Sequence, residues 1–165
     1  MIKKTIQNIF NLFGYKITKA NTIDSTDLDK ITTLLTNVKE PIIFDVGGNI
    51  GQSIERYKKL FPKCKIYSFD PIKQEVDKLI LKYEKDKSII LNNVAIGEKP
   101  GNLDFNVNVL SGTSSFKNLI PNTTWIKERS KAINIESKNF IPETKKVNTK
   151  VITLDDYCKE KNIHQ

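Results

Sequence analysis

Apolar and polar positions change their period several times between residues 41 and 96. Short apolar runs, typical of strands buried on both faces, alternate with stretches in which apolar residues recur every three or four positions, as on amphipathic helices. In chain order these are a strand at Ile42–Val46, a helix at Ile54–Phe61, a strand at Lys65–Phe69, a helix at Pro71–Tyr83 and a strand at Ser88–Ile96. This order predicts a parallel sheet with right-handed crossover connections.

Helical spacing also precedes this segment, over the first dozen residues and again over Thr26–Val38. Lys3 and Lys4 beside the first apolar stripe permit a role at a membrane surface. Packing on the protein's own domain or on a second copy is favoured, because the polar face consists mainly of Gln and Asn. We therefore divide the chain into an N-terminal helical segment, residues 1–40, and an α/β domain, residues 41–165.

After residue 96 the pattern predicts less regular structure. A turn at Gly97–Gly101 leads into a half-exposed strand at Leu103–Val109, where apolar and polar residues alternate. Residues 111–146 are polar and irregular, which predicts either an insertion that folds over the site or an ordered loop. A strand at Val147–Ile152 and a short helix from Leu154 to Lys161 complete the prediction.

The composition suits one globular domain, with 165 residues of which 38% are hydrophobic. The formal net charge of +8 raises the question of nucleic-acid binding. Nearly all of the positive charge is lysine, however, and Arg56 and Arg129 are the only arginines. No basic run is interleaved with aromatic residues, so we predict no nucleic-acid partner.

Histidine and cysteine usage excludes several kinds of site. His164 is the only histidine and lies next to the C-terminus, which excludes histidine triads and metal sites with two or more histidines. Cys64 and Cys158 lack metal-ligand spacing and suit a reducing compartment. No apolar run reaches the ~18 residues of a membrane span, and the N-terminus lacks a secretory signal pattern. We predict a cytoplasmic protein without a metal or a transmembrane segment.

The candidate chemistry begins in the loop Asp45–Gly51, between the first strand and the following helix. Gly47, Gly48 and Gly51 allow backbone conformations and a close ligand approach that side chains would prevent. Dinucleotide sites use a related glycine loop to hold a pyrophosphate. The spacing differs here, because Asn49 occupies the place of the second glycine in that pattern.

Asp45, at the end of the first strand, also argues against a pyrophosphate. Its carboxylate would repel a phosphate and attract an ammonium group, by about 4 kcal/mol for charges ~4 Å apart at an effective dielectric of about 20. S-adenosylmethionine carries an ammonium and a sulfonium group and no phosphate, so the loop predicts a site for this cofactor. The alternative is that Asp45 only caps the following turn.

Two further strand ends complete the predicted cofactor site. Asp70 follows Gly51 by nineteen residues and ends the second strand, where an acidic residue can accept hydrogen bonds from both ribose hydroxyls. The alternative is that Asp70 caps the helix that Pro71 opens. The third strand ends near Asn93 and Ala95, against which the adenine is expected to lie.

Five sequence blocks together resemble the FkbM-family methyltransferases. They are DVGGNIG from Asp45, FDP, NNVAIGEKPGNLDF, SGTSS from Ser111 to Ser115, and VITLDDY from Val151 to Tyr157. The resemblance implies a Rossmann-like class I methyltransferase sheet and S-adenosylmethionine-dependent O-methylation of a sugar, glycan or natural-product hydroxyl. It covers residue 41 to the C-terminus.

This sequence departs from the family pattern at Gly48, where the family usually has alanine, and at Asp70, where it usually has glutamate. Each change keeps a small residue or a carboxylate. We expect Ser111–Ser115 and residues 116–146 to face the acceptor. No residue stands out as a catalytic base.

A third departure is that the chain stops at Gln165, before the family's strand with a lysine, an acidic residue and a Glu-Gly pair. We therefore expect the N-terminal portion of a methyltransferase, in which the outer edge of the Ile42–Val46 strand is unpaired. A second copy or a partner protein would cover that edge. Two alternatives stay open: an inactive cofactor-binding fragment or interaction module, and an NAD-dependent oxidoreductase, which the loop spacing and Asp45 oppose.

Overall fold

A computed structural model describes residues 29, 31–33, 35–108, 111–120, 123–132 and 145–164. The chain divides into two compact units, Met1–Val38 and Lys39–Gln165. The described residues of the first unit up to residue 35 are helical, within the helix predicted for Thr26–Val38. The helix predicted over the first dozen residues lies outside the described ones. No described helix is long and apolar enough to cross a membrane.

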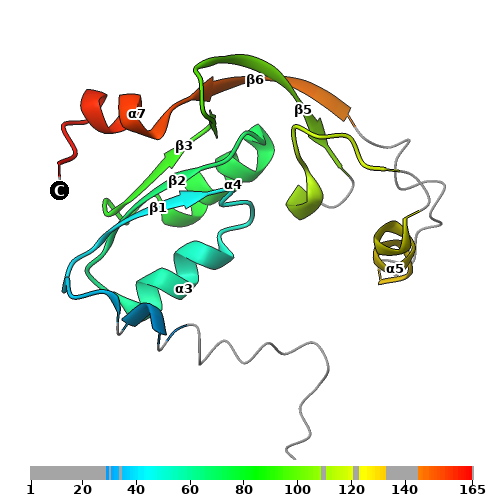
Figure 1. The fold of residues 1–165 in the computed structure, drawn as a ribbon. Helices are drawn as coiled ribbons and strands as arrows, with labels where there is room; N and C mark the ends of the chain where they lie inside the picture. The colour runs from blue at the N-terminus through cyan, green and yellow to red at the C-terminus, as the bar shows by residue number, and fades with distance from the viewer. Residues whose placement is uncertain are drawn as a thin grey trace, which may run out of the picture. The chain divides into compact units, whose positions relative to one another are not determined.

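The second unit contains the predicted parallel sheet. Its strands β1 (Ile42–Val46), β2 (Lys65–Phe69) and β3 (Ile89–Asn92) pair in that order, with Ile42 opposite Lys65 and Ile66 opposite Ile89. Helices α3 (Gln52–Leu60) and α4 (Lys73–Tyr83) connect the strands, as Figure 1 shows. The expected order of strands and helices is confirmed, although α4 begins two residues after Pro71.

The two faces of this sheet are covered by different helices because successive strand residues point to opposite faces. On one face, Ile66 packs in a cluster with Ile54 of α3 and Leu79 of α4. On the other face, Tyr67 and Phe69 pack against Tyr157 of α7 (Leu154–Glu160). Burial on both faces explains why the strands have continuous apolar sequences rather than alternating ones.

The strand predicted at Ser88–Ile96 is wrong as a single element. β3 ends at Asn92, and Ala95–Ile96 forms β4 in a second sheet, where it pairs with β6 (Lys145–Ile152). β2 ends at Phe69, opposite Asn92, so no neighbouring strand continues the ladder beyond that point. The chain then leaves the first sheet, and Ala95 pairs with Val151 in the second sheet.

The second sheet has the order β4-β6-β5, and β5 (Gly101–Val107) runs antiparallel to β6 along its whole length. The half-exposed strand predicted at Leu103–Val109 is therefore present, two residues earlier. In Figure 1 this ribbon rises above the carboxyl ends of the first sheet.

The expectation that residues 111–146 are irregular is partly wrong. A 3-10 turn, η1, covers Ser111–Thr113, and helix α5 covers Thr124–Ala132. The Thr123 hydroxyl accepts a hydrogen bond from the Ile126 N–H, and Ile126 and Ser130 are buried. The sequence did not predict α5 because only a narrow face of this helix is buried, so its apolar residues are too few to show a helical period.

Candidate functional site

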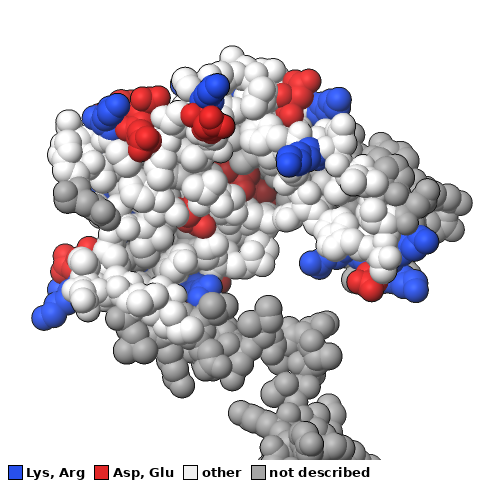
Figure 2. Space-filling model, in the orientation of Figure 1, with Lys and Arg blue, Asp and Glu red and all other residues white. Residues whose placement is uncertain are grey.

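A cavity of about 520 Å³ lies at the carboxyl ends of β1 and β2. Ligands of open α/β sheets bind at this position. Figure 2 shows acidic atoms in the hollow of this face and most lysines and arginines toward its periphery. The lining residues are Val46, Gly47, Gly48, Asn49, Gln52, Ser53, Phe69, Asp70, Pro71, Ile72, Ala95, Ile96, Phe105, Gly112, Ser114, Ser115 and Phe116. Asp70 is the only ionisable residue among them.

The glycine loop is held to the end of β2. The N–H groups of Gly47 and Gly48 both donate to the carbonyl of Phe69, at 2.8 and 3.2 Å. Gly47 has a φ of 84° and open space where a side chain would start, so its backbone borders the cavity without obstruction. Asn49 also has a positive φ, of 44°, which asparagine tolerates better than most residues.

Gly51 serves packing rather than ligand access. Its φ is 87°, and a Cβ there would lie 2.7 Å from Cδ2 of Leu79 on α4. Because Gly51 has no side chain, the start of α3 can pack closely against α4. Gly51 does not line the cavity.

Asp70 lies at the floor of the cavity and is only 5% exposed. One carboxylate oxygen accepts from the Asn49 N–H at 2.8 Å, and the other accepts from the Ile72 N–H at 2.8 Å. Burial raises the pKa of this carboxyl, and the two N–H groups oppose the rise. Each oxygen retains a lone pair for a further donor.

The capping alternative for Asp70 is wrong for α4. The N-cap residue of that helix is Ile72, and no side chain caps it. Asp70 instead closes a local turn through the Ile72 N–H and ties the glycine loop to it through Asn49. Both contacts fix the carboxylate in place at the cavity.

Asp45 lies in a smaller cavity of about 270 Å³ and does not line the larger one. The two cavities share Val46, Gln52 and Ser53, so they adjoin. Asp45 is 7% exposed, and its Oδ2 accepts a hydrogen bond from the Ser68 hydroxyl at 2.9 Å. Arg56 of α3 lines the smaller cavity as well and was not singled out by the sequence pattern.

The two residues predicted to lie beside the adenine, Asn93 and Ala95, do not line the same cavity. Ala95 lines the cavity next to Ile96 and Ile72. Asn93 does not: its side-chain amide donates to the Asp70 carbonyl at 3.0 Å, and it borders a separate cavity of about 550 Å³. Asn93 therefore supports the backbone of Asp70 instead of lining the larger cavity.

The wall opposite the glycine loop comes from β5 and the segment after it. Asn106 and Ser115 exchange backbone hydrogen bonds, and the Asn108 amide donates to the Thr113 carbonyl at 2.7 Å. These bonds place Gly112, Ser114 and Ser115 in the lining of the cavity.

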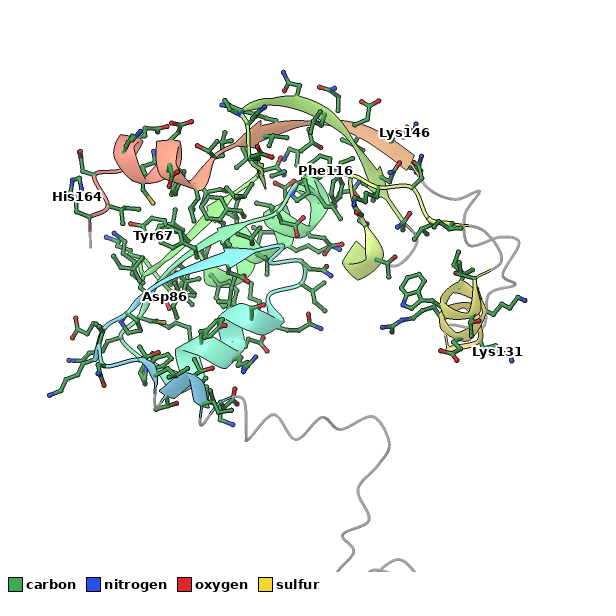
Figure 3. All side chains as sticks on the ribbon, in the orientation of Figure 1. Tyr67, Asp86, Phe116, Lys131, Lys146 and His164 are labelled. Carbon is green, nitrogen blue, oxygen red and sulfur yellow. The ribbon has the colours of Figure 1, made fainter. Side chains whose placement is uncertain are left out.

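An aromatic pair completes this wall. The rings of Phe105 and Phe116 meet edge to face with centroids 4.9 Å apart, and Figure 3 labels Phe116 in the segment beside β5. Sequence analysis missed Phe105 as a site residue, since its only signal was the alternation of β5. Phe116 was included only as the first residue of the range 116–146 and was not singled out.

A family model for the FkbM methyltransferase domain matches residues 45–165. The chain belongs to the FkbM methyltransferase family. The matched region begins at Asp45 and contains every residue that lines the 520 Å³ cavity. A comparison with curated proteins found no match.

For an FkbM domain, the described residues supply a site with one buried carboxylate, which accepts hydrogen bonds, beside a glycine loop. Among them, no group of three or more His, Cys, Asp or Glu side chains is placed to hold a metal ion. His164 follows α7 and does not line the cavity (Figure 3). The chemistry available to this FkbM site is therefore recognition by one buried carboxylate, amide and hydroxyl groups, and apolar rings.

Proposed function

We propose that this domain binds S-adenosylmethionine in the 520 Å³ cavity and transfers its methyl group to an acceptor hydroxyl. The observation that carries the proposal is the buried Asp70 carboxylate, fixed by two backbone N–H groups in a cavity whose described lining residues include no lysine or arginine. A fixed anion in this cavity opposes a pyrophosphate there and favours a ligand group that donates hydrogen bonds.

The cavity suits the adenosine part of this cofactor. Its volume lies within the range of about 300–1,000 Å³ that small-molecule sites occupy. Asp70 has two lone pairs left for the ribose hydroxyls, and Gly47 leaves its side of the cavity open. We assign the adenine to the apolar surface of Ile72, Ala95 and Ile96.

We assign the amino-acid end of the cofactor to the smaller, adjoining cavity. Asp45 supplies a negative charge there and Arg56 a positive one. This pair complements the ammonium and carboxylate of an α-amino acid. This assignment gives Asp45 a role in binding in addition to any role in the turn that follows it.

When bound, the cofactor supplies an electrophilic methyl group on its sulfonium. The residues of this chain act by binding and orienting, which by itself contributes strongly to catalysis of a displacement reaction. Phe69, Phe105 and Phe116 give part of the cavity an apolar lining. Ser114 and Ser115 are the acceptor-side polar residues, and the family resemblance points to a sugar, glycan or natural-product hydroxyl.

One observation favours a second candidate function, binding of the cofactor without methyl transfer. Both oxygens of Asp70, the only ionisable group lining the larger cavity, already accept backbone hydrogen bonds. The remaining lone pairs are assigned to the ribose hydroxyls, so with the cofactor bound Asp70 is not available as a general base. Binding of S-adenosylmethionine without turnover of any tested hydroxyl acceptor would favour this candidate.

Calorimetric titration tests the binding proposal. S-adenosylmethionine should bind the wild-type chain and NAD should not, and Asp70→Ala should weaken binding by about tenfold or more, the loss of hydrogen bonds to a charged group. Asp77→Ala is the matched control, because Asp77 is exposed on α4 in an ion pair with Lys73 and lies outside both cavities. NAD binding alone, or equal losses in the two variants, would contradict the proposal.

A further inference from the structure

Gly48 differs from the other glycines of the loop in the reason for its presence. Gly47 and Gly51 have positive φ angles, whereas Gly48 does not. What excludes a side chain at Gly48 is space. A Cβ at this position would lie 2.1 Å from Oγ of Ser68 and 2.9 Å from Oδ2 of Asp45.

Ser68 fills the room that Gly48 leaves. It lies opposite Asp45 in the parallel pairing of β1 and β2, and it is only 2% exposed. Its hydroxyl donates to Oδ2 of Asp45 at 2.9 Å. A buried carboxylate oxygen without a donor is costly, so this hydrogen bond both satisfies the oxygen and holds the carboxylate in one orientation.

We propose that Ser68 is a positioning residue for Asp45 and that Gly48 is present to admit the Ser68 hydroxyl. The role in ligand binding rests on the proposed function, in which Asp45 meets the ammonium of the cofactor. A carboxylate oriented before the ligand arrives spares the cost of ordering it on binding. Gly48 and Ser68 are therefore one coupled unit, although they lie on different segments of the chain.

A stability cycle tests the coupling independently of any ligand. Gly48→Ala alone should lower the folding equilibrium constant about ten- to a hundredfold, as overpacking of a full site does. In a Ser68→Ala background the same change should cost less than about threefold. The nearest remaining atom of residue 68 would be its Cβ, at 3.5 Å, and Asp45 would be free to turn aside.

The control for this cycle is Gly101→Ala, because a Cβ at Gly101 would meet nothing within 4 Å. Its effect should be the same in the wild-type background and in the Ser68→Ala background. Equal costs of Gly48→Ala in the two backgrounds would overturn the coupling. If Gly48→Ala alone does not fold, folding of the double variant supports the coupling and its failure to fold overturns it.

A binding experiment tests the positioning role itself. S-adenosylhomocysteine has the amino-acid end that Asp45 would meet, whereas methylthioadenosine keeps the adenine and ribose and lacks that end. Ser68→Ala should weaken binding of S-adenosylhomocysteine by about tenfold and change binding of methylthioadenosine by less than about twofold. A merely structural role would weaken both ligands alike, and that result, or no loss for either, would overturn the proposal.

The two experiments also separate this inference from the proposed function. A wild-type chain that binds neither adenosine ligand would refute the proposed function and with it the binding role of Ser68. The stability cycle would still decide whether the Ser68 hydroxyl and Gly48 are coupled.

Discussion

The backbone N–H of Asn49 donates to a carboxylate oxygen of Asp70 at 2.8 Å, joining residues twenty-one positions apart in the chain. Asn49 belongs to the loop after β1, and Asp70 directly follows β2. The same carboxylate also accepts from Ile72 at the start of α4. One buried side chain therefore holds the glycine loop, the end of β2 and the next helix in a common geometry.

The raised pKa of Asp70 has a consequence for stability. Burial favours the neutral carboxyl, so between the ordinary value of 3.8 and the raised folded-state pKa the folded protein binds more protons than the unfolded one. The free energy of unfolding should therefore fall as pH rises through this window. Urea denaturation across the acidic range measures it.

Asp70→Asn is the comparison for this pH dependence, because it cannot ionise. The difference in unfolding free energy between wild type and variant should change across the window and become constant above the folded-state pKa. A difference that is constant throughout would show that Asp70 does not titrate with a raised pKa.

Gly51→Ala should destabilise the domain by about 2–4 kcal/mol. The reason is a left-handed φ of 87° together with a Cβ placed 2.7 Å from Leu79. Gly101→Ala has neither problem and should stay within about 0.5 kcal/mol of wild type. Chemical denaturation of both variants measures the contrast, and similar losses would refute it.

Tyr157 attaches α7 to the sheet. Its ring meets Tyr67 and Phe69 edge to face, with centroids 5.7 and 4.8 Å away, and its hydroxyl donates to Oδ1 of Asn92 at 3.1 Å. Tyr157→Phe should cost about 0.5–1.5 kcal/mol by losing the hydrogen bond, whereas Tyr157→Ala should cost about 3–5 kcal/mol by losing the ring. Thermal and urea unfolding distinguish the two, and equal losses would contradict this division.

Arg56 allows a test of how the proposed cofactor is oriented. Arg56→Gln should weaken the binding of S-adenosylmethionine about tenfold, because it removes a charge-assisted contact to the carboxylate of the cofactor. Methylthioadenosine, which lacks that carboxylate, should bind the variant as it binds wild type. Arg129→Gln, at the other arginine of the chain, is the control and should affect neither ligand. Equal weakening of both ligands by Arg56→Gln would refute this orientation.

The local elements of the first sheet could be predicted from the sequence because their causes are local. β2 covers Lys65–Phe69 as expected, since its apolar residues face helices on one side and Tyr157 on the other. The strand end at Asn92 could not be predicted in this way. Apolar residues resume at Val94–Ile96 after Asn92 and Asn93, and the ladder ends because β2 ends opposite Asn92.

The candidate site also has a part that the sequence predicts and a part that depends on tertiary packing. Its glycine loop and the acidic ends of β1 and β2 follow from spacing along the chain, and the resemblance to FkbM methyltransferases is confirmed by the family match. Phe105 and Arg56 had no comparable signal, and Phe116 was included only within the range 116–146. Phe105 reaches the larger cavity from β5, and its neighbours there include the glycine loop and the end of β2, which a linear pattern does not relate to β5.

Gly48 shows what the sequence determined and what the tertiary structure determined. By itself the sequence determined a small residue in a strand-to-helix loop, a position at which alanine looked equivalent. Tertiary structure decided that glycine leaves room for the Ser68 hydroxyl, because parallel pairing brings Ser68 opposite Asp45 and places that hydroxyl where a Cβ would be. Period and composition predict elements, since each element follows from nearby residues. Contacts between strand ends arise only when the elements pack, and those contacts set the geometry of the site.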